Sequence, residues 1–271
     1  ASARETASRV TMGAICRKLL SSFGIIIGSY VVSIGKIKAR IPKFDNIIEL
    51  FESAENSPVR CPDQKASSEM IQEIKKARES GETLGGVFEC VAANVPPGLG
   101  SHVHWDRRLS SRLLAAVGSI PAIKGVETGD AFKNATRKGS QVHDAIWIDS
   151  NGFIKRSSNR AGGIEGGIST GQPIVIRAAM KPISTLMRGM QSIDLASGKP
   201  AQTVYERSDI CAVPRAAVVA EAMVAFVLAD AIIEKLGGDS LNEMLPRFNN
   251  LKLNKITDFS MDNKNWRFGY E

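Results

Sequence analysis

The most unusual segment of the sequence is a glycine-rich run over residues 161–171, which reads AGGIEGGISTG. Glycine accepts positive φ angles and lets the backbone approach a ligand or another segment closely. The run lacks the Gly-x-Gly-x-x-Gly spacing and the Lys-Ser/Thr ending of nucleotide-binding loops. Its spacing is therefore compatible with a structural turn and with a ligand-binding loop, and both interpretations stay open at this point.

Three further segments combine charged and hydroxyl side chains. Residues 181–185, KPIST, could hold a phosphate through their cation and hydroxyls, although solvation of a loop accounts for the same composition. Residues 207–209, RSD, place a guanidinium beside a carboxylate, as a surface ion pair or a catalytic pair would. Residues 2–6, SARET, begin a helical pattern, so they either cap that helix or help its N–H groups to bind an anion.

Other common catalytic patterns are absent from the sequence. No Cys-x-x-Cys pair, zinc-protease helix, Walker loop or serine nucleophile elbow occurs. The three histidines have no Cys or Glu at the spacing of a metal or nucleophile site, so we expect them to be structural or exposed and predict no metal. They are His102, His104 and His143.

Helices and strands alternate along the chain. Apolar periodicity predicts helices over 3–22, 68–78 and 214–236, and a further helix capped by Asp106. β-Branched stretches predict strands over 25–37, 84–95, 122–128 and 173–180. The Asn151-Gly152 pair indicates a hairpin between 142–148 and 153–156, and a second hairpin is expected around 196–198. A polar stretch, 52–67, is expected to connect the first strand to the next helix.

The order of these elements predicts an α+β fold. A strand, loop and helix occur in similar order over 84–118 and 172–236, which suggests an internal duplication. We expect one domain over 1–248 and a polar C-terminal tail over 249–271.

Composition narrows the class of protein further. With 271 residues, 43% hydrophobic and 23% charged, the chain has the composition of a globular protein. The net charge of +7 favours anionic partners, but the basic residues are dispersed, so we expect no nucleic acid partner. Four acidic or basic residues interrupt 216–236, which predicts a core helix and no membrane association. Four widely spaced cysteines and no signal-peptide pattern predict free thiols in the cytoplasm.

Taken in order, these segments resemble the chorismate synthase family. The resemblance runs through residues 2–6, 119–127, 139–141, 159–171, 180–185 and 207–209, and it extends to about residue 245. It implies a β-α-β sandwich with internal duplication and a homotetramer. It also implies a carbon–oxygen lyase that ends the shikimate pathway of aromatic amino acid biosynthesis. That enzyme removes phosphate from 5-enolpyruvylshikimate 3-phosphate by anti-1,4-elimination to give chorismate, with reduced FMN as cofactor and NADPH as a potential reductant.

The resemblance also implies roles for particular residues. Asp209 matches a family aspartate that takes a proton from flavin N5, and Arg4 and Arg207 are expected to bind substrate anions. With these matches, the glycine-rich segment is expected to lie against the cofactor. The residues expected to contact FMN are Ala1, Ser2, Pro121, Ala122, Gly166, Lys181, Pro182, Ile183, Ser184, Thr185 and Arg207.

Family members carry a portion ahead of the Ser-Ala-Arg-Glu motif that holds two proton-donating histidines and several arginines. No histidine of this sequence matches them, so we expect an N-terminal portion beyond the sequence given. The alternative hypothesis is a non-catalytic remnant that binds flavin or anions.

Overall fold

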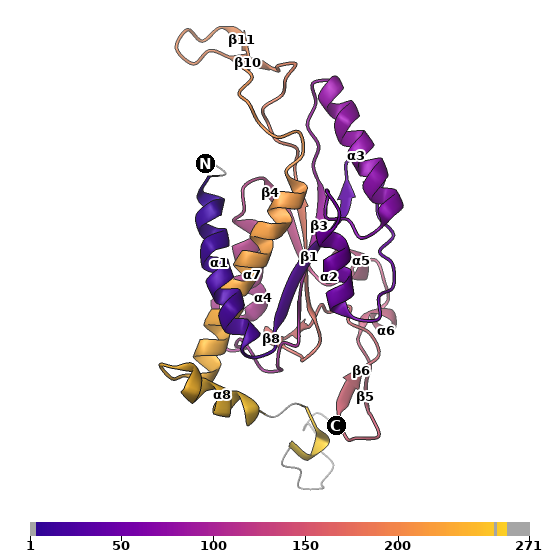
Figure 1. The fold of residues 1–271 in the computed structure, drawn as a ribbon, viewed down its shortest axis with the longest axis vertical. Helices are drawn as coiled ribbons and strands as arrows, with labels where there is room; N and C mark the ends of the chain where they lie inside the picture. The colour runs from indigo at the N-terminus through magenta and orange to yellow at the C-terminus, as the bar shows by residue number, and fades with distance from the viewer. Residues whose placement is uncertain (1–3, 252–253, 259–271) are drawn as a thin grey trace, which may run out of the picture.

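The centre of the molecule is a five-stranded antiparallel sheet with the strand order β2-β1-β3-β9-β4 (Figure 1). It comes from a computed structural model, which describes residues 4–251 and 254–258. The strands span Ile26–Ile34 (β1), Ile37–Lys38 (β2), Gly86–Ala93 (β3), Ile123–Thr128 (β4) and Ile174–Met180 (β9).

Three helices cover one face of this sheet: α1 (Glu5–Ser21), α4 (Leu109–Gly118) and α7 (Val213–Leu236) (Figure 1). Successive strand side chains point to opposite faces, so every second residue can enter the core between sheet and helices. Val31, Phe88 and Ile176 are fully buried there, in one hydrophobic core with Leu113 of α4 and Leu228 of α7. Burial of this apolar area against the helices is the main source of the fold's stability.

Helices α1 and α7 cross at close range. A Cβ atom added at Gly13 would lie 2.3 Å from the Cβ of Ala222, closer than any side chain tolerates. The missing side chain of Gly13 therefore permits the contact that fixes α1 against α7.

Helix α7 is the core helix that the sequence predicts. Among the described residues it alone has the length and apolarity to cross a bilayer, but 72% of its most apolar window is buried inside the protein. It packs against β1, β3, α1 and α4. A helix that is apolar on all sides is expected to be covered on several sides.

The opposite face of the sheet is covered in part by α2 (Ile47–Glu55). Its Leu50 and Ala54 pack against Tyr30 and Val91 of the sheet. The prediction of a polar connection over 52–67 is wrong for residues 52–55, which belong to this helix. The helix begins where the Asn46 side chain accepts hydrogen bonds from two backbone N–H groups.

Helix α3 (Gln64–Glu79) packs at the β1–β2 edge and begins four residues before the expected start. Asp63 caps it by accepting a hydrogen bond from Ala66 N. The expected cap at Asp106 is wrong: this residue lies in a short 3₁₀ helix, Trp105–Arg107, and α4 begins after Arg108.

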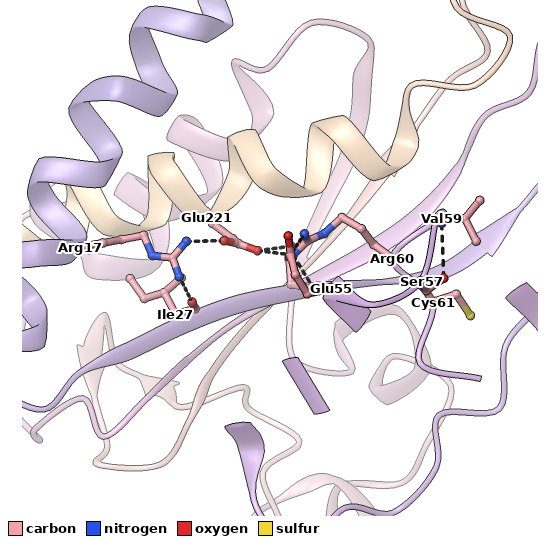
Figure 2. Close-up of polar contacts among 9 residues, drawn as sticks. Arg17, Ile27, Glu55, Ser57, Val59, Arg60, Cys61 and Glu221 are labelled. Carbon is pink, nitrogen blue, oxygen red and sulfur yellow. Dashed lines mark hydrogen bonds and ion pairs between the residues drawn. The ribbon is translucent and has the colours of Figure 1, made fainter. Parts of the chain in front are cut away.

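A buried polar cluster joins the helical layer to the sheet (Figure 2). Glu221 of α7 is 4% exposed and accepts hydrogen bonds from Arg17 Nη1 (2.6 Å), Arg60 Nη2 (2.8 Å) and Ser29 Oγ (2.6 Å). Arg17 also donates to Ile27 O, at 2.9 Å. These partners satisfy a carboxylate that would otherwise be costly to bury.

The remaining elements are short, and two pairs of them, β5–β6 and β10–β11, form the hairpins expected from the sequence. Strands β10 and β11 form an arm, defined here as residues 187–206, that projects away from the sheet (Figure 1). The short elements are α5 (Ala131–Asn134), α6 (Gly139–Val142), β5 (Ile146–Ile148), β6 (Ile154–Arg156), β7 (Ile164–Glu165), β8 (Ile168–Ser169), β10 (Gln191–Ile193), β11 (Pro200–Gln202), α8 (Leu241–Asn249) and a 3₁₀ helix over Ile256–Asp258.

The expected α+β class is confirmed. The predicted strand–loop–helix units over 84–118 and 172–236 correspond to β3–α4 and β9–α7, and strands β3 and β9 are direct neighbours in one sheet. A β-α-β sandwich requires a second sheet beyond the helices. Within the described ranges there is one large sheet, and the helical layer leaves Met12, Ile15 and Phe226 about half exposed. The domain boundary after residue 248 stays a prediction, and most of the expected tail lies outside the described residues.

Candidate active site

A cavity of about 570 Å³ opens at one end of the sheet, where β9 ends, β4 begins and the N-termini of α1 and α7 converge. Its volume falls within the usual range for small-molecule sites. The residues that line it come from segments far apart in the sequence. They are Thr6, Ile120, Pro121, Ala122, Met180, Lys181, Ile183, Ser184, Asp209, Ala212, Arg215, Ala216 and Val219.

One backbone hydrogen bond brings two of these segments together. Lys181 N, just after β9, donates to Ala122 O, just before β4, at 2.9 Å. Ala122 has a φ of +67°, a left-handed conformation that costs energy for any residue with a Cβ. The surrounding contacts hold this strained residue at the cavity wall, and such strain concentrates at functional sites.

The turn over residues 181–185 is fixed from a second side. Thr83 Oγ1 donates to Ile183 O at 2.6 Å. Ser208 Oγ donates to Thr185 O at 3.4 Å, so the two ends of the arm meet beside the cavity. The segment after the arm is held against the sheet by Leu84 N, which donates to Ile210 O at 2.8 Å.

Asp209 forms an ion pair with Arg215, in which Arg215 Nη1 donates to Asp209 Oδ2. The sequence is compatible with an ion pair between Asp209 and Arg207, but in the structure Asp209 has a different partner. Arg207 is exposed and does not line the cavity. Close by, burial raises the pKa of the Cys211 thiol, which keeps the thiol neutral near pH 7.

The chemistry of the cavity suits an anionic ligand with an apolar body. Lys181 supplies positive charge, and Asp209, which is paired with Arg215, supplies a carboxylate able to accept a proton. Hydroxyls of Thr6 and Ser184 add hydrogen-bonding groups. The apolar wall is formed by Ile120, Met180, Ile183, Ala212, Ala216 and Val219.

Most described residues that were expected at one site from the sequence do meet here. Pro182 and Thr185 lie in the turn that supplies part of the wall, and Arg4 is exposed beside the start of α1. Ala1 and Ser2 lie outside the described residues. The expected residues that line the cavity are Pro121, Ala122, Lys181, Ile183, Ser184 and Asp209.

Within one chain the glycine-rich segment does not line this cavity, and its expected contact with the cofactor stays a prediction. Gly166 precedes β9, whereas Lys181 follows it, and a seven-residue strand separates its ends by about 20 Å. The glycine-rich segment instead lines a separate cavity of about 480 Å³ through Glu165, Ile168, Ser169 and Thr170. Gly166 itself has a φ of +60° and open space where a Cβ would be.

The first part of the glycine-rich segment is a structural turn. The buried Asp144 carboxylate accepts hydrogen bonds from Ser158 Oγ, Arg160 N (2.9 Å) and Ala161 N (3.0 Å). Burial alone would raise the pKa of Asp144, but these hydrogen bonds outweigh it and lower the pKa below its usual range. A Cβ at Gly162 would lie 2.3 Å from Gly129 N.

Several residues that line the cavity lie outside the motifs of the sequence. Arg215 is the most informative, because a cation in the first turn of a helix faces the positive end of the helix dipole. Its position next to Pro214 and six residues after Asp209 could have drawn attention to it. The three histidines were expected to be structural or exposed, and all three are exposed. Within the described ranges, no group of three or more His, Cys, Asp or Glu residues could hold a metal ion.

A polar row also crosses the opposite face of the sheet. Tyr30, Glu89, Arg177 and Glu127 are register partners on β1, β3, β9 and β4. Tyr30 donates to Glu89, and Arg177 Nε donates to the same carboxylate at 2.8 Å. Burial and the adjacent Glu89 raise the pKa of Tyr30, so this hydroxyl keeps its proton.

Comparisons with known proteins agree with the fold and show the family of this chain. Residues 1–233 match the family model described as chorismate synthase. Chorismate synthase of Desulforudis audaxviator is 53% identical over 245 residues, which are 90% of this chain and 63% of that protein. The enzyme of Aquifex aeolicus is 52% identical over 256 residues, which are 92% of this chain and 64% of that protein.

A crystal structure of chorismate synthase superposes with a TM-score of 0.79 at 48% identity, covering 92% of this chain and 69% of the other. The chain therefore spans somewhat less than two thirds of the length of these curated relatives. A match to the family model over most of the chain, together with this structural likeness, identifies the family. The chain belongs to the chorismate synthase family.

Proposed function

We propose that this protein catalyses the anti-1,4-elimination of phosphate from 5-enolpyruvylshikimate 3-phosphate to give chorismate, with reduced FMN as cofactor. It is then a carbon–oxygen lyase of aromatic amino acid biosynthesis that acts in the cytoplasm. The main support is the cavity in which Pro121, Ala122, the 181–184 turn and Asp209 converge. Membership of the chorismate synthase family supports the same reaction.

The residues of the cavity fit FMN. The apolar wall offers a surface for a flat ring system, and the neighbouring cation of Lys181 can pair with a phosphate. Ala122, which lines the cavity in a left-handed conformation, presents only a methyl group to a ligand. When bound, reduced FMN supplies electron density while phosphate leaves the substrate.

The residues of this chain bind the anions and move one proton. Arg4 and Arg207 are placed on segments that border the cavity, and their guanidinium groups suit carboxylate and phosphate. Lys181 adds a third cation. Fixed positive charge stabilises the departing phosphate most strongly where water is excluded. Asp209 is the general base that accepts a proton at its carboxylate.

Gly166 can join this site only from another copy of the chain. We propose a homotetramer in which the glycine-rich segment of one subunit faces the cavity of a neighbour. The arm supports subunit association, because a two-stranded hairpin is marginally stable on its own and this one exposes apolar side chains. The exposed fractions are 59% for Ile193, 90% for Leu195 and 84% for Val204.

The function is tested by an anaerobic assay of the full-length gene product with reduced FMN and 5-enolpyruvylshikimate 3-phosphate. Formation of chorismate is expected, and its absence would refute the proposal. NADPH is then tested as the reductant by supplying it with oxidised FMN. Flavin binding without turnover would instead favour a non-catalytic remnant. That outcome is read from a flavin titration of the same sample.

The shared site is tested separately by mixing two inactive proteins. Gly166→Val and Asp209→Asn subunits, mixed after dissociation, are expected to regain part of the activity, because some cavities then combine two intact halves. No recovery would place Gly166 outside the site. The arm is tested with Leu195→Asp, which is expected to reduce the mass measured by light scattering.

A further inference from the structure

Arg215 occupies a position that is electrostatically unfavourable for its own helix. It lies in the first turn of α7, where the unpaired N–H groups give the helix its positive end. A cation there needs compensation from a nearby anion. Arg215 obtains it by turning back to Asp209, which lies four residues before the helix begins.

Asp209 in turn needs a partner to fix its carboxylate. It belongs to a stretch without regular secondary structure, 203–209, between the arm and α7, and its side chain is 41% exposed. The backbone is anchored just beyond it by the Leu84–Ile210 hydrogen bond. Arg215 holds the Asp209 side chain by donating a hydrogen bond to Asp209 Oδ2. Within the described ranges, Asp209 Oδ1 makes no hydrogen bond.

We propose that Arg215 is a positioning residue for Asp209. Its guanidinium holds Oδ2, so that the carboxylate keeps one orientation at the cavity wall and Oδ1 remains available to accept the proton. This inference rests on the proposed function, in which Asp209 is the base. Both residues line the same cavity, so the ion pair lies where the reaction is proposed to occur.

The proposal predicts a specific kinetic pattern in the full-length protein. Arg215→Ala is expected to lower kcat by about 10- to 100-fold, the usual cost of a misplaced reacting group, and to change KM and the Kd for FMN less than about twofold. Arg215→Lys is expected to recover part of kcat, because it retains the charge but lacks the planar fork. A larger effect on KM or Kd than on kcat would show an anion-binding role and overturn the proposal.

A double-mutant comparison separates positioning from a general effect on stability. If Arg215 acts through Asp209, the double variant Asp209→Asn, Arg215→Ala is expected to be no slower than Asp209→Asn alone. Multiplicative losses would show that the two residues act independently and would refute the inference. Arg107→Ala is the matched control, because Arg107 is also an exposed arginine paired with a carboxylate, Glu234, and lies outside the cavity. Its kcat is expected to stay within about twofold of the parent.

A structural readout does not depend on activity. In a crystal structure of the Arg215→Ala protein, the Asp209 side chain is expected to occupy several rotamers or a new one, with α7 unmoved. A single rotamer unchanged from the parent would refute the positioning role even in a protein that makes no chorismate. Absence of chorismate from the parent protein would refute the proposed function instead.

Discussion

Arg60 Nη2 lies 2.8 Å from Glu221 Oε1 at the junction between the helical layer and the sheet, with side chains only 12% and 6% exposed. Arg60 reaches this position from a turn in which its own φ is +55°. Ser57 stabilises the turn by accepting hydrogen bonds from Val59 N and Cys61 N (Figure 2). The pair therefore connects the turn before α3 with the middle of α7.

Glu221→Gln is expected to destabilise the protein strongly. It removes the negative charge that compensates Arg60 and Arg17, and breaking a buried ion pair costs about 3 to 5 kcal/mol. Urea denaturation measures the loss. Glu5→Gln is the control, since it removes an exposed i,i+4 pair with Arg9 and is expected to cost about 0.5 kcal/mol. Equal losses of stability in the two variants would show that burial of the Glu221 ion pairs does not increase their contribution to stability.

The Asp144 carboxylate is expected to make stability depend on acid pH. Its pKa is lower in the folded protein than in the unfolded chain, so its contribution is present above about pH 4. The contribution is lost as the pH falls through the folded-state value. Asp144→Asn leaves one backbone N–H group without its acceptor, which costs about 1 to 3 kcal/mol at pH 7.

The difference in unfolding free energy between the Asp144→Asn protein and the parent is expected to shrink below pH 4, as followed by urea titrations at several pH values. Asp106→Asn, an exposed carboxylate in a short 3₁₀ helix, is expected to show no such dependence. A difference at Asp144 that stays constant down to pH 3 would contradict the assigned cause.

Replacing Ala122 by a smaller or by a larger residue is expected to change the stability of the protein in opposite directions, because Ala122 has a left-handed conformation. Ala122→Gly relieves the strain at φ +67° and is expected to raise the free energy of unfolding by about 0.5 kcal/mol after the entropy of the unfolded chain is included. Ala122→Val is expected to lower it by more than about 1 kcal/mol, because a β-branched residue tolerates this conformation poorly.

Thermal unfolding measures both Ala122 variants. Ala135→Val is the control, because Ala135 is an exposed alanine with a φ of −60°. If valine costs the same at both positions, the backbone at Ala122 is not under strain.

Substitution of two glycines in the glycine-rich segment by alanine is expected to cost very different amounts of stability. Gly162→Ala brings a Cβ to 2.3 Å from Gly129 N and should cost more than about 2 kcal/mol. Gly166→Ala meets only the backbone cost of a positive φ, about 1 kcal/mol, because nothing lies within 4 Å of its Cβ. Chemical denaturation compares the two. If Gly166→Ala proved as destabilising as Gly162→Ala, Gly166 would have a structural role within its own subunit.

Local patterns predicted the parts of the fold that depend on local physics. The apolar character of 214–236 predicted a buried helix, and the Asn151-Gly152 turn predicted a hairpin, because both depend on residues close in the sequence. Helix α2 was not predicted, since its burial depends on packing against Tyr30 and Val91. The start of α4 was also misplaced, because Asp106 enters a 3₁₀ turn before the helix begins.

The sequence by itself determined the α+β class, the family and most of the segments that line the cavity, because ordered motifs carry this information directly. Only the tertiary structure decided which segments meet. Strand β9 places Lys181 at one end of the sheet and the glycine-rich segment at the other, and the first turn of α7 turns Arg215 toward Asp209. Strand length and helix direction set these distances in space, and spacing along the chain does not encode them.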